Sequence, residues 1–182
     1  VNGQPAADSA VALAALGASV EVMYEDGAEL LSMDRLYAGF GKSTVDSTKS
    51  LVTRILIPEA GPGEGSGYAR LEQRKALALP MVCVAAFLGI RDGMVERCRI
   101  AMAPVGVGPV RAIEAERFLI GKAAEKEVFS EAGRLALKNA NPRDSLIRGS
   151  KRYREEVLPV MVERALSEAL SDAEGREKEV EQ

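Results

Sequence analysis

The sequence contains no histidine and no tryptophan, two cysteines, and only 4% aromatic residues. Without histidine, a serine-type catalytic triad, a histidine general base and most zinc sites are excluded. Cys83 and Cys98 are too few for an iron–sulfur cluster, which usually takes four protein ligands. The side chains of this chain are therefore poorly equipped for acid–base catalysis or for holding a metal cluster.

A basic excess and a long apolar run are also lacking. The chain has 24 Lys and Arg against 27 Asp and Glu, so we expect no nucleic-acid partner, since such binding needs clustered positive charge. The longest apolar run, Ala76 to Ile90, contains Pro80 and is shorter than the ~18 residues of a membrane span. Residues 1–18 carry no Lys or Arg, unlike a signal peptide. We expect a cytoplasmic protein without a membrane span, with both cysteines as reduced thiols.

The 182 residues that are present, 47% of them hydrophobic, suit one globular domain or two small ones that share a core. In residues 1–59 the patterns predict a helix and three strands with a hairpin turn at Asp26-Gly27. The expected elements are the helix Ser9–Leu16, the strands Ser19–Tyr24, Glu29–Ser32 and Ser50–Pro58, and a helical turn over Asp34–Gly39.

Glycine and proline then dominate the segment EAGPGEGSG, Glu59 to Gly67, which predicts a flexible linker over residues 60–67. Residues 68–170 are expected to form a three-stranded antiparallel sheet packed with about three helices, an α+β fold. Cys98, Ile100 and Met102 would share one face of the last strand. The expected strands are Tyr68–Arg74, Met81–Arg91 and Met94–Pro104, and the expected helices are Ile113–Ile120, Lys126–Asn139 and Arg148–Leu170.

Two features near the carboxyl end concern the last helix. Pro159 lies inside its pattern and should kink or divide it. Residues 171–182, SDAEGREKEVEQ, carry five acids against two bases, which predicts a frayed, disordered tail.

Four segments carry a family pattern in order along the chain. They are VNGQPAADSAVALAALGASVEV (1–22), SLVTRILIP (50–58), APVGVGPVRAIEAERFLIGK (103–122) and DSLIRGSKRYREEVLPVMVERAL (144–166). These resemble the forms SPxAD…ALLALGAxV, ELLTEIRIP, GGVAPxPVRAxxAExxLxGK and DxRGSxxYR of one family. That family is the FAD-binding (medium) subunit of the molybdenum hydroxylases, which include carbon monoxide and xanthine dehydrogenases.

The resemblance implies an oxidoreductase subunit in a three-part complex. A large subunit would oxidise the substrate at a molybdopterin centre, and two [2Fe–2S] clusters in a small subunit would pass electrons to FAD and then to an external acceptor. Residues 1–59 would be the later part of the middle FAD-binding subdomain, and residues 68–170 the carboxy-terminal subdomain. The family's glycine-rich phosphate loops, including TxGGN, are absent from this sequence. We therefore expect a missing amino-terminal FAD-binding portion, or alternatively a non-enzymatic docking subunit that has lost the flavin.

Five residues match family positions at the flavin. Asp8 matches the acid of SPxAD and Ala7 could add a backbone contact, although an acid in a first helical turn is also favoured by the helix dipole. Leu51 and Val52 match the strand that packs against the isoalloxazine, or are ordinary core residues. Arg70 stands where many relatives have a lysine beside the ring, where a cation would stabilise the charge of reduced flavin.

The other residues that match the family motifs are expected to support the fold, or their role stays open. A structural or interface role is expected for Asp144, Arg148, Ser150, Tyr153 and Arg154, and for Glu114 and Glu116. Ser150 or Ser145 would cap the following helix. Arg74 and Lys75 match a basic pair but are typical of solvated strand-end charges. Leu77 and Ala78 replace the acids of xanthine dehydrogenases, which leaves the electron acceptor open.

Overall fold

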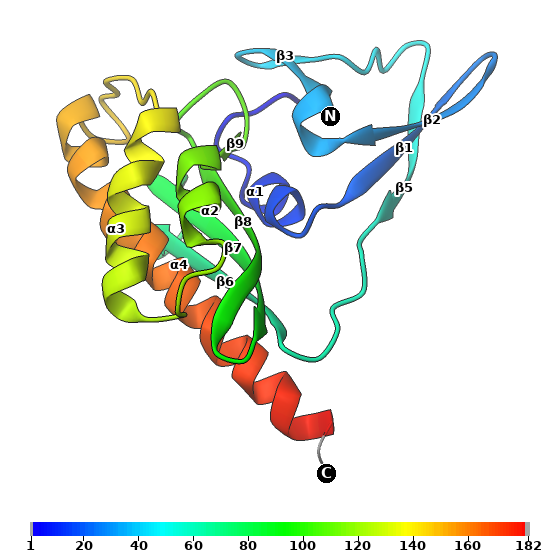
Figure 1. Ribbon diagram of the computed structural model, residues 1–182. Helices are drawn as coiled ribbons and strands as arrows, with labels where there is room; N and C mark the ends of the chain where they lie inside the picture. The colour runs from blue at the N-terminus through cyan, green and yellow to red at the C-terminus, as the bar shows by residue number, and fades with distance from the viewer. Residues whose placement is uncertain (1, 181–182) are drawn as a thin grey trace.

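The computed structural model describes residues 2–180 and has an α+β architecture, as the sequence predicts (Figure 1). Three antiparallel sheets have the strand orders β2–β1–β5, β3–β4 and β6–β7–β8–β9. The helical elements are α1 (Asp8–Ala15), η1 (Met33–Leu36), α2 (Ile113–Leu119), α3 (Lys126–Ala136), η2 (Leu137–Asn139) and α4 (Lys151–Val180). The strands are β1 (Ser19–Tyr24), β2 (Gly27–Ser32), β3 (Tyr37–Gly39), β4 (Lys42–Ser43), β5 (Leu51–Leu56), β6 (Glu64–Leu71), β7 (Val82–Arg91), β8 (Met94–Ala103) and β9 (Val110–Arg111).

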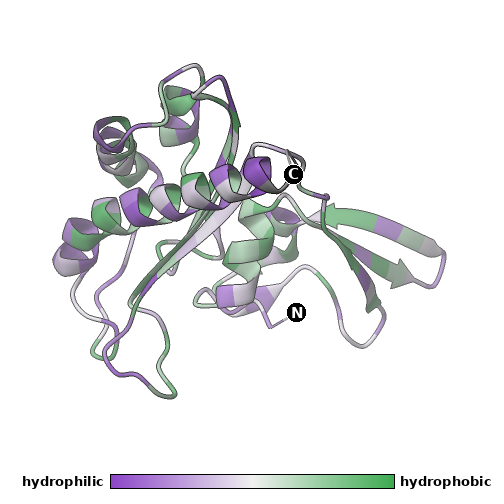
Figure 2. Ribbon diagram, turned by 90° about the horizontal axis from the view of Figure 1, so that it is seen from below, coloured by the Kyte–Doolittle hydropathy of each residue, from purple (hydrophilic) through white to green (hydrophobic). Residues whose placement is uncertain are grey.

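The small sheet β2–β1–β5 contains a bulge that changes which residues share a face. Val22 pairs with Val52 and Glu21 pairs with Arg54, so Thr53 is an extra residue on β5. Because a bulge shifts the alternation by one, Val52 and Ile55 both lie opposite the buried valines of β1. Figure 2 shows the β1–β2 hairpin of this sheet, with its many hydrophobic residues, projecting from the rest of the chain.

The large sheet is covered on both faces, which explains the nearly continuous apolar sequence of β7. Val82, Val84, Ala86 and Leu88 of β7 pack under α2, α3 and α4 (Figure 1). The alternate residues face α1. Cys83 and Ala85 of β7, together with Ala101 and Ala103 of β8, form a layer of small side chains against Val11 and Ala15. These small residues allow α1 to approach the sheet closely.

Strand β8 also departs from strict alternation. Gly89 pairs with Arg97 while Ile90 pairs with Val95, so β8 has an extra residue. Val95 is therefore buried in the same cluster as Ile100 and Met102, although strict alternation along the strand predicts that it lies on the opposite face. Strand β9 pairs with β8 and extends the expected three-stranded sheet to four.

The second half of the expected linker over residues 60–67 belongs to strand β6. Pairing of β6 with β7 begins at Glu64, opposite Gly89. The glycines here serve packing, because a Cβ on Gly67 would lie 2.6 Å from the backbone nitrogen of Ala169 in α4. A Cβ on Gly65 would lie 2.9 Å from Ala173 Cα. Only glycine lets the backbone of α4 rest directly on this strand.

The acidic tail is helical rather than disordered through Val180, and residues 181 and 182 lie outside the described range. Asp172 of this segment and Glu168, one turn before it, bind the large sheet. Ser66 N donates to Asp172 Oδ2 at 2.9 Å, and Tyr68 N donates to Glu168 Oε2 at 3.0 Å. These carboxylates satisfy amide groups on the free edge of β6, as unpaired edge strands require.

The last helix also runs unbroken past Pro159, which lies within it but does not divide it. Gly133 of α3 lies against this point, since a Cβ there would come 2.5 Å from Pro159 O. The two helices therefore pack backbone to backbone beside the proline. Among residues 2–180, no helix combines the length and apolar character needed to cross a bilayer.

Candidate flavin site at the start of helix α1

The first turn of α1 divides the predicted site residues between its two sides. Ala7, the residue before the helix, has an extended backbone and lines a cavity together with Ser9. Asp8 between them lies on the side facing β6. Successive helix residues point about 100° apart, so neighbours in sequence readily serve two different surfaces.

A charged cluster forms where Asp8 meets β6. Tyr68 Oη donates to Asp8 Oδ1 at 2.7 Å, and Arg70 Nε lies 3.5 Å from the same oxygen. Arg70 also pairs with Glu72 and donates to the backbone carbonyl of Ala78. Tyr68 and Arg70 are two residues apart on a strand, so both face α1. The predicted pair Asp8 and Arg70 is thus brought together, with two carboxylates around one guanidinium.

Burial alters the acid–base properties around this cluster. Desolvation raises the pKa of Tyr68 well above its usual range, with further contributions from Cys83 and Asp8. Desolvation likewise raises the pKa of Cys83, which lies opposite Arg70 on β7, to about 12. Both groups are therefore neutral at physiological pH. Tyr68 acts as a hydroxyl donor, and Cys83 is a buried thiol.

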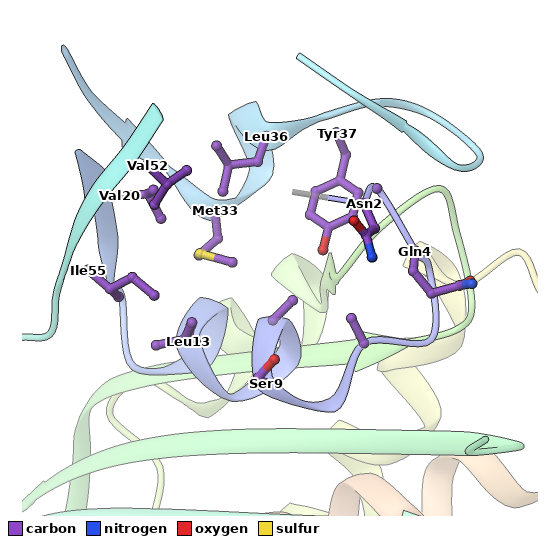
Figure 3. Close-up of a pocket in the computed structure, with 13 residues that line it drawn as sticks. Asn2, Gln4, Ser9, Leu13, Val20, Met33, Leu36, Tyr37, Val52 and Ile55 are labelled. Carbon is purple, nitrogen blue, oxygen red and sulfur yellow. The ribbon is translucent and has the colours of Figure 1, made fainter. Parts of the chain in front are cut away.

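On the other side of α1 lies a cavity of about 400 Å³ between the helix, η1 and the β1–β5 pair (Figure 3). Its walls are mostly apolar, with Leu13 from α1, Met33 from η1 and Val52 from β5. Tyr37 reaches in from beyond η1, and burial raises its pKa. The volume lies in the ~300–1,000 Å³ range of small-molecule sites.

The five predicted residues thus reach different places. Asp8 and Arg70 meet in the charged cluster, and Ala7 and Val52 line the cavity. Leu51 reaches neither, since it is 67% exposed and pairs with Met23 on the opposite face of the sheet.

Sequence reasoning missed two residues of the site, Ile55 and Tyr68. Ile55 lines the cavity only because of the bulge in β5, which strict alternation does not predict. Tyr68 was visible as an aromatic residue two positions before Arg70 on an expected strand. That spacing would have placed it beside Arg70.

The residues of the DxRGSxxYR segment build the start of α4. Ser150 Oγ accepts the backbone N–H of Tyr153 at 3.2 Å, which confirms the helix cap. Asp144 Oδ1 accepts the N–H of Lys151 at 2.7 Å. Arg154, only 3% exposed, donates to three backbone carbonyls, those of Met81, Arg143 and Pro104. It joins three loops that are far apart in sequence.

The expected structural role of Glu116 also agrees with its geometry. Its buried carboxylate accepts from Ile100 N at 2.8 Å and from Arg111 Nε at 2.6 Å. It thereby ties α2 to β8 and β9. Glu114 is half-exposed beside Arg117 at 3.9 Å.

The segment between β6 and β7 carries the basic pair. Arg74 and Lys75 are exposed, and Arg74 donates to Leu77 O at 2.9 Å within the same loop. Leu77 is 95% exposed with a φ of 50°. Neither cation joins the charged cluster. In the described part of the chain, no group of three or more His, Cys, Asp or Glu side chains could hold a metal ion.

Comparison with known families assigns both halves of the chain. Residues 68–169 match the family model of the CO dehydrogenase flavoprotein C-terminal domain. Residues 1–60 match that of the FAD binding domain in molybdopterin dehydrogenase. The gap between the two matches, residues 61–67, contains the start of β6.

Individual relatives agree with these matches. The chain is 29% identical to the carbon monoxide dehydrogenase medium chain of Afipia carboxidovorans, covering 94% of this chain and 59% of that protein. It is 24% identical to a putative xanthine dehydrogenase FAD-binding subunit of Escherichia coli, covering 96% of this chain and 60% of the other. The chain thus spans about three fifths of the length of these relatives.

Solved structures show the same fold. The carbon monoxide dehydrogenase of Hydrogenophaga pseudoflava superposes with a TM-score of 0.87 at 27% identity, covering 94% of this chain and 58% of that one. The reconstituted CO dehydrogenase of Oligotropha carboxidovorans gives 0.86 at 28% identity, covering 94% and 59%. The chain belongs to the FAD-binding subunit family of the molybdenum hydroxylases, the carbon monoxide and xanthine dehydrogenase type.

Proposed function

We propose that this chain holds the flavin end of FAD around the first turn of α1. Asp8 and Arg70 would contact its polar edge, and Ala7 and Val52 would give it an apolar wall. The observation that carries the proposal is the meeting of Asp8 with Arg70, at 3.5 Å, from separate parts of the chain. The family match over residues 1–60 supports FAD as the cofactor.

The polar groups present fit such a ligand. Arg70 Nε is buried and makes no hydrogen bond within the described residues. The Asp8 side chain is 45% exposed, and only its Oδ1 is engaged by Tyr68. A buried donor without a partner is costly and is normally satisfied by another group. A flavin offers carbonyl, ring-nitrogen and hydroxyl groups, so it could serve both residues.

The protein's own part in the chemistry is positioning and charge. FAD, when bound, supplies the electron-transfer chemistry. Tyr68, kept protonated by its surroundings, orients the Asp8 carboxylate. Arg70 holds the same carboxylate and, through Ala78 O, the segment that follows β6. Because Asp8 and Glu72 flank it, Arg70 offsets their negative charge and adds little net positive charge.

The names of the relatives support the wider role. They include a medium chain and a FAD-binding subunit of such dehydrogenases. The flavin here would accept electrons from [2Fe–2S] clusters in a small subunit, as the family resemblance implies. Those electrons would originate at a molybdopterin centre in a large subunit and leave to an external acceptor, in the cytoplasm. The complex would be an oxidoreductase with this chain as its flavin component.

The Asp8→Asn variant tests the flavin site in the protein purified with its complex. It keeps the side-chain size but removes the charge that Arg70 faces, so we expect the FAD content per protein, read from flavin absorbance, to fall at least several-fold. Asp26→Asn is the matched control, because Asn-Gly supports the same hairpin turn as Asp26-Gly27. Equal FAD content in both variants would overturn the assignment of Asp8, and a complex that never contains flavin would overturn the proposed function.

Arg70→Gln tests the charge balance. Removing the guanidinium leaves Asp8 and Glu72 uncompensated, so reduction of the flavin becomes less favourable and its potential falls. The expected change is on the order of tens of millivolts, since ~30 mV corresponds to ~1.4 kcal/mol for a two-electron couple. Redox titration of the bound flavin measures it. An unchanged or raised potential would contradict the role of Arg70.

A further inference from the structure

A second cavity, of about 230 Å³, lies between the segment before α1, the β3–β4 turn and the loop that leads into α4. Arg143, Arg148 and Arg154 line it, with one acidic residue, Asp144. It shares no lining residue with the cavity beside α1 and contains neither Asp8 nor Arg70. The flavin assignment leaves it unexplained.

The three arginines have no negative partner among the described side chains. No carboxylate of residues 2–178 lies within 4.0 Å of any of their guanidinium nitrogens. Arg154 donates to three neutral carbonyls, and the Arg143 guanidinium lies over the Phe40 ring at 3.7 Å from its centroid. Arg148 Nε is buried and has no hydrogen-bond partner in the part of the chain that the structure describes.

The neighbouring carboxylate does not compensate for this charge. Asp144 Oδ1 is engaged by the backbone N–H of Lys151. The pKa of Arg154 is lowered, first by burial and then by the positive charges of Arg148 and Arg143. A partly buried cluster of like charges is unfavourable unless an anion enters it.

We propose that this cavity binds a small tetrahedral oxyanion, of which phosphate is the representative. Guanidinium groups present paired N–H donors that match the oxygens of phosphate and carboxylate, and several of them can share one tetrahedral ion. The cavity is smaller than the ~300–1,000 Å³ typical of sites for larger ligands, which favours an ion over a whole nucleotide. A bound oxyanion would supply the missing acceptor to Arg148 Nε.

The test is calorimetric titration of the purified full chain, with any subunits that co-purify, using sodium phosphate against sodium chloride of equal ionic strength. Wild type should bind phosphate, and Arg148→Gln should weaken binding at least tenfold. Arg152→Gln is the matched control, because Arg152 is 89% exposed, lies in α4 close to Arg154 and, among the described residues, pairs only with Glu156. It should bind phosphate as wild type does.

The remaining outcomes are also decisive. If Arg148→Gln does not fold, Arg143→Gln replaces it, since Arg143 is exposed and its loss should weaken binding several-fold. Parallel titration with ADP distinguishes free phosphate from a nucleotide phosphate: binding of ADP alone, lost in the Arg148 or Arg143 variant, supports the oxyanion site with a nucleotide as its source. No binding of either ligand by wild type, or equal binding by the Arg148 and Arg152 variants, would overturn the proposal.

Discussion

Replacing Gly67 by alanine adds one methyl group at the contact between β6 and α4. An ideal Cβ at this position would lie 2.6 Å from Ala169 N and 2.7 Å from Glu168 Cβ, and closer still to Ala165 O. Favourable contacts of a carbon atom begin near ~3.5 Å. Two of the three neighbours are backbone atoms of a helix, so they cannot rotate away. The helix and the strand must separate by roughly an ångström.

The free-energy cost of this separation comes from overpacking and from two stretched hydrogen bonds. Overpacking of a well-packed site costs about 1–3 kcal/mol. Moving α4 also stretches the bonds from Ser66 N to Asp172 and from Tyr68 N to Glu168, which are exposed and add less than a buried charged bond would. We expect a loss of about 3 kcal/mol. For a chain of this length, this lowers the melting temperature by roughly 6–12 °C.

Thermal unfolding followed by circular dichroism measures this loss, with Gly175→Ala as control. Gly175 lies in α4 with nothing within 4 Å of its Cβ position, so alanine there should stabilise the chain by about 0.5–1 kcal/mol. The same substitution therefore has opposite signs at two positions. Faster hydrogen exchange at the Ser66 and Tyr68 amides should accompany the Gly67 variant. A Gly67→Ala protein that melts within ~1 °C of wild type would refute the reasoning.

Further predictions concern the supports of the fold. Arg154→Met should lower the free energy of unfolding, measured in urea, by about 3–5 kcal/mol, because three carbonyls lose their donor at about 1–3 kcal/mol each. A loss no larger than that of Arg152→Met, at an exposed position of the same helix, would contradict this prediction. Ser150→Ala should cost about 1 kcal/mol through the lost cap, and an unchanged urea midpoint would speak against that cap. Burial raises the pKa of Cys83 to about 12 and also raises that of Cys98, so at pH 8 both thiols should react with Ellman's reagent only after unfolding. Since the unfolded thiols ionise near ~8.5, their contribution to stability is present below that pH and is lost as pH rises toward the folded pKa, which an alkaline titration of unfolding would show.

Much of the secondary structure follows from local signals. Asp26-Gly27 between two alternating segments predicts the β1–β2 hairpin, and Asp92-Gly93 predicts the turn between β7 and β8. In both cases the turn residues and the flanking pattern agree. Elements specified by neighbours in sequence are therefore well predicted.

The errors come from contacts between distant segments. Gly65 and Gly67 indicate flexibility when only their neighbours are considered, but α4, a hundred residues later, requires them as packing surface. The acids of the tail alone indicate solvation, but Asp172 accepts a hydrogen bond from the amide of Ser66. Composition alone cannot reveal a partner that is remote along the chain.

The site residues, too, were predicted only in part. Family motifs led to Asp8 and Arg70, which the fold brings together, and to Val52, which lines the cavity. Leu51 and Val52 both match the family's flavin strand, but adjacent strand residues point to opposite faces, and Leu51 lies on the exposed one. Ile55 also lines the cavity because of the bulge in β5, which no local sequence pattern predicts.

The small residues beneath α1 have a consequence for exchanging segments between relatives. Val11 and Ala15 come from the region matched by one family model, while Cys83 and Ala101 beneath them come from the region matched by the other. A chimera that takes its first sixty residues from one relative and the remainder from another would join two surfaces that were never fitted to each other. Such chimeras should fold only when both layers are transplanted together, because the two layers form one packed interface.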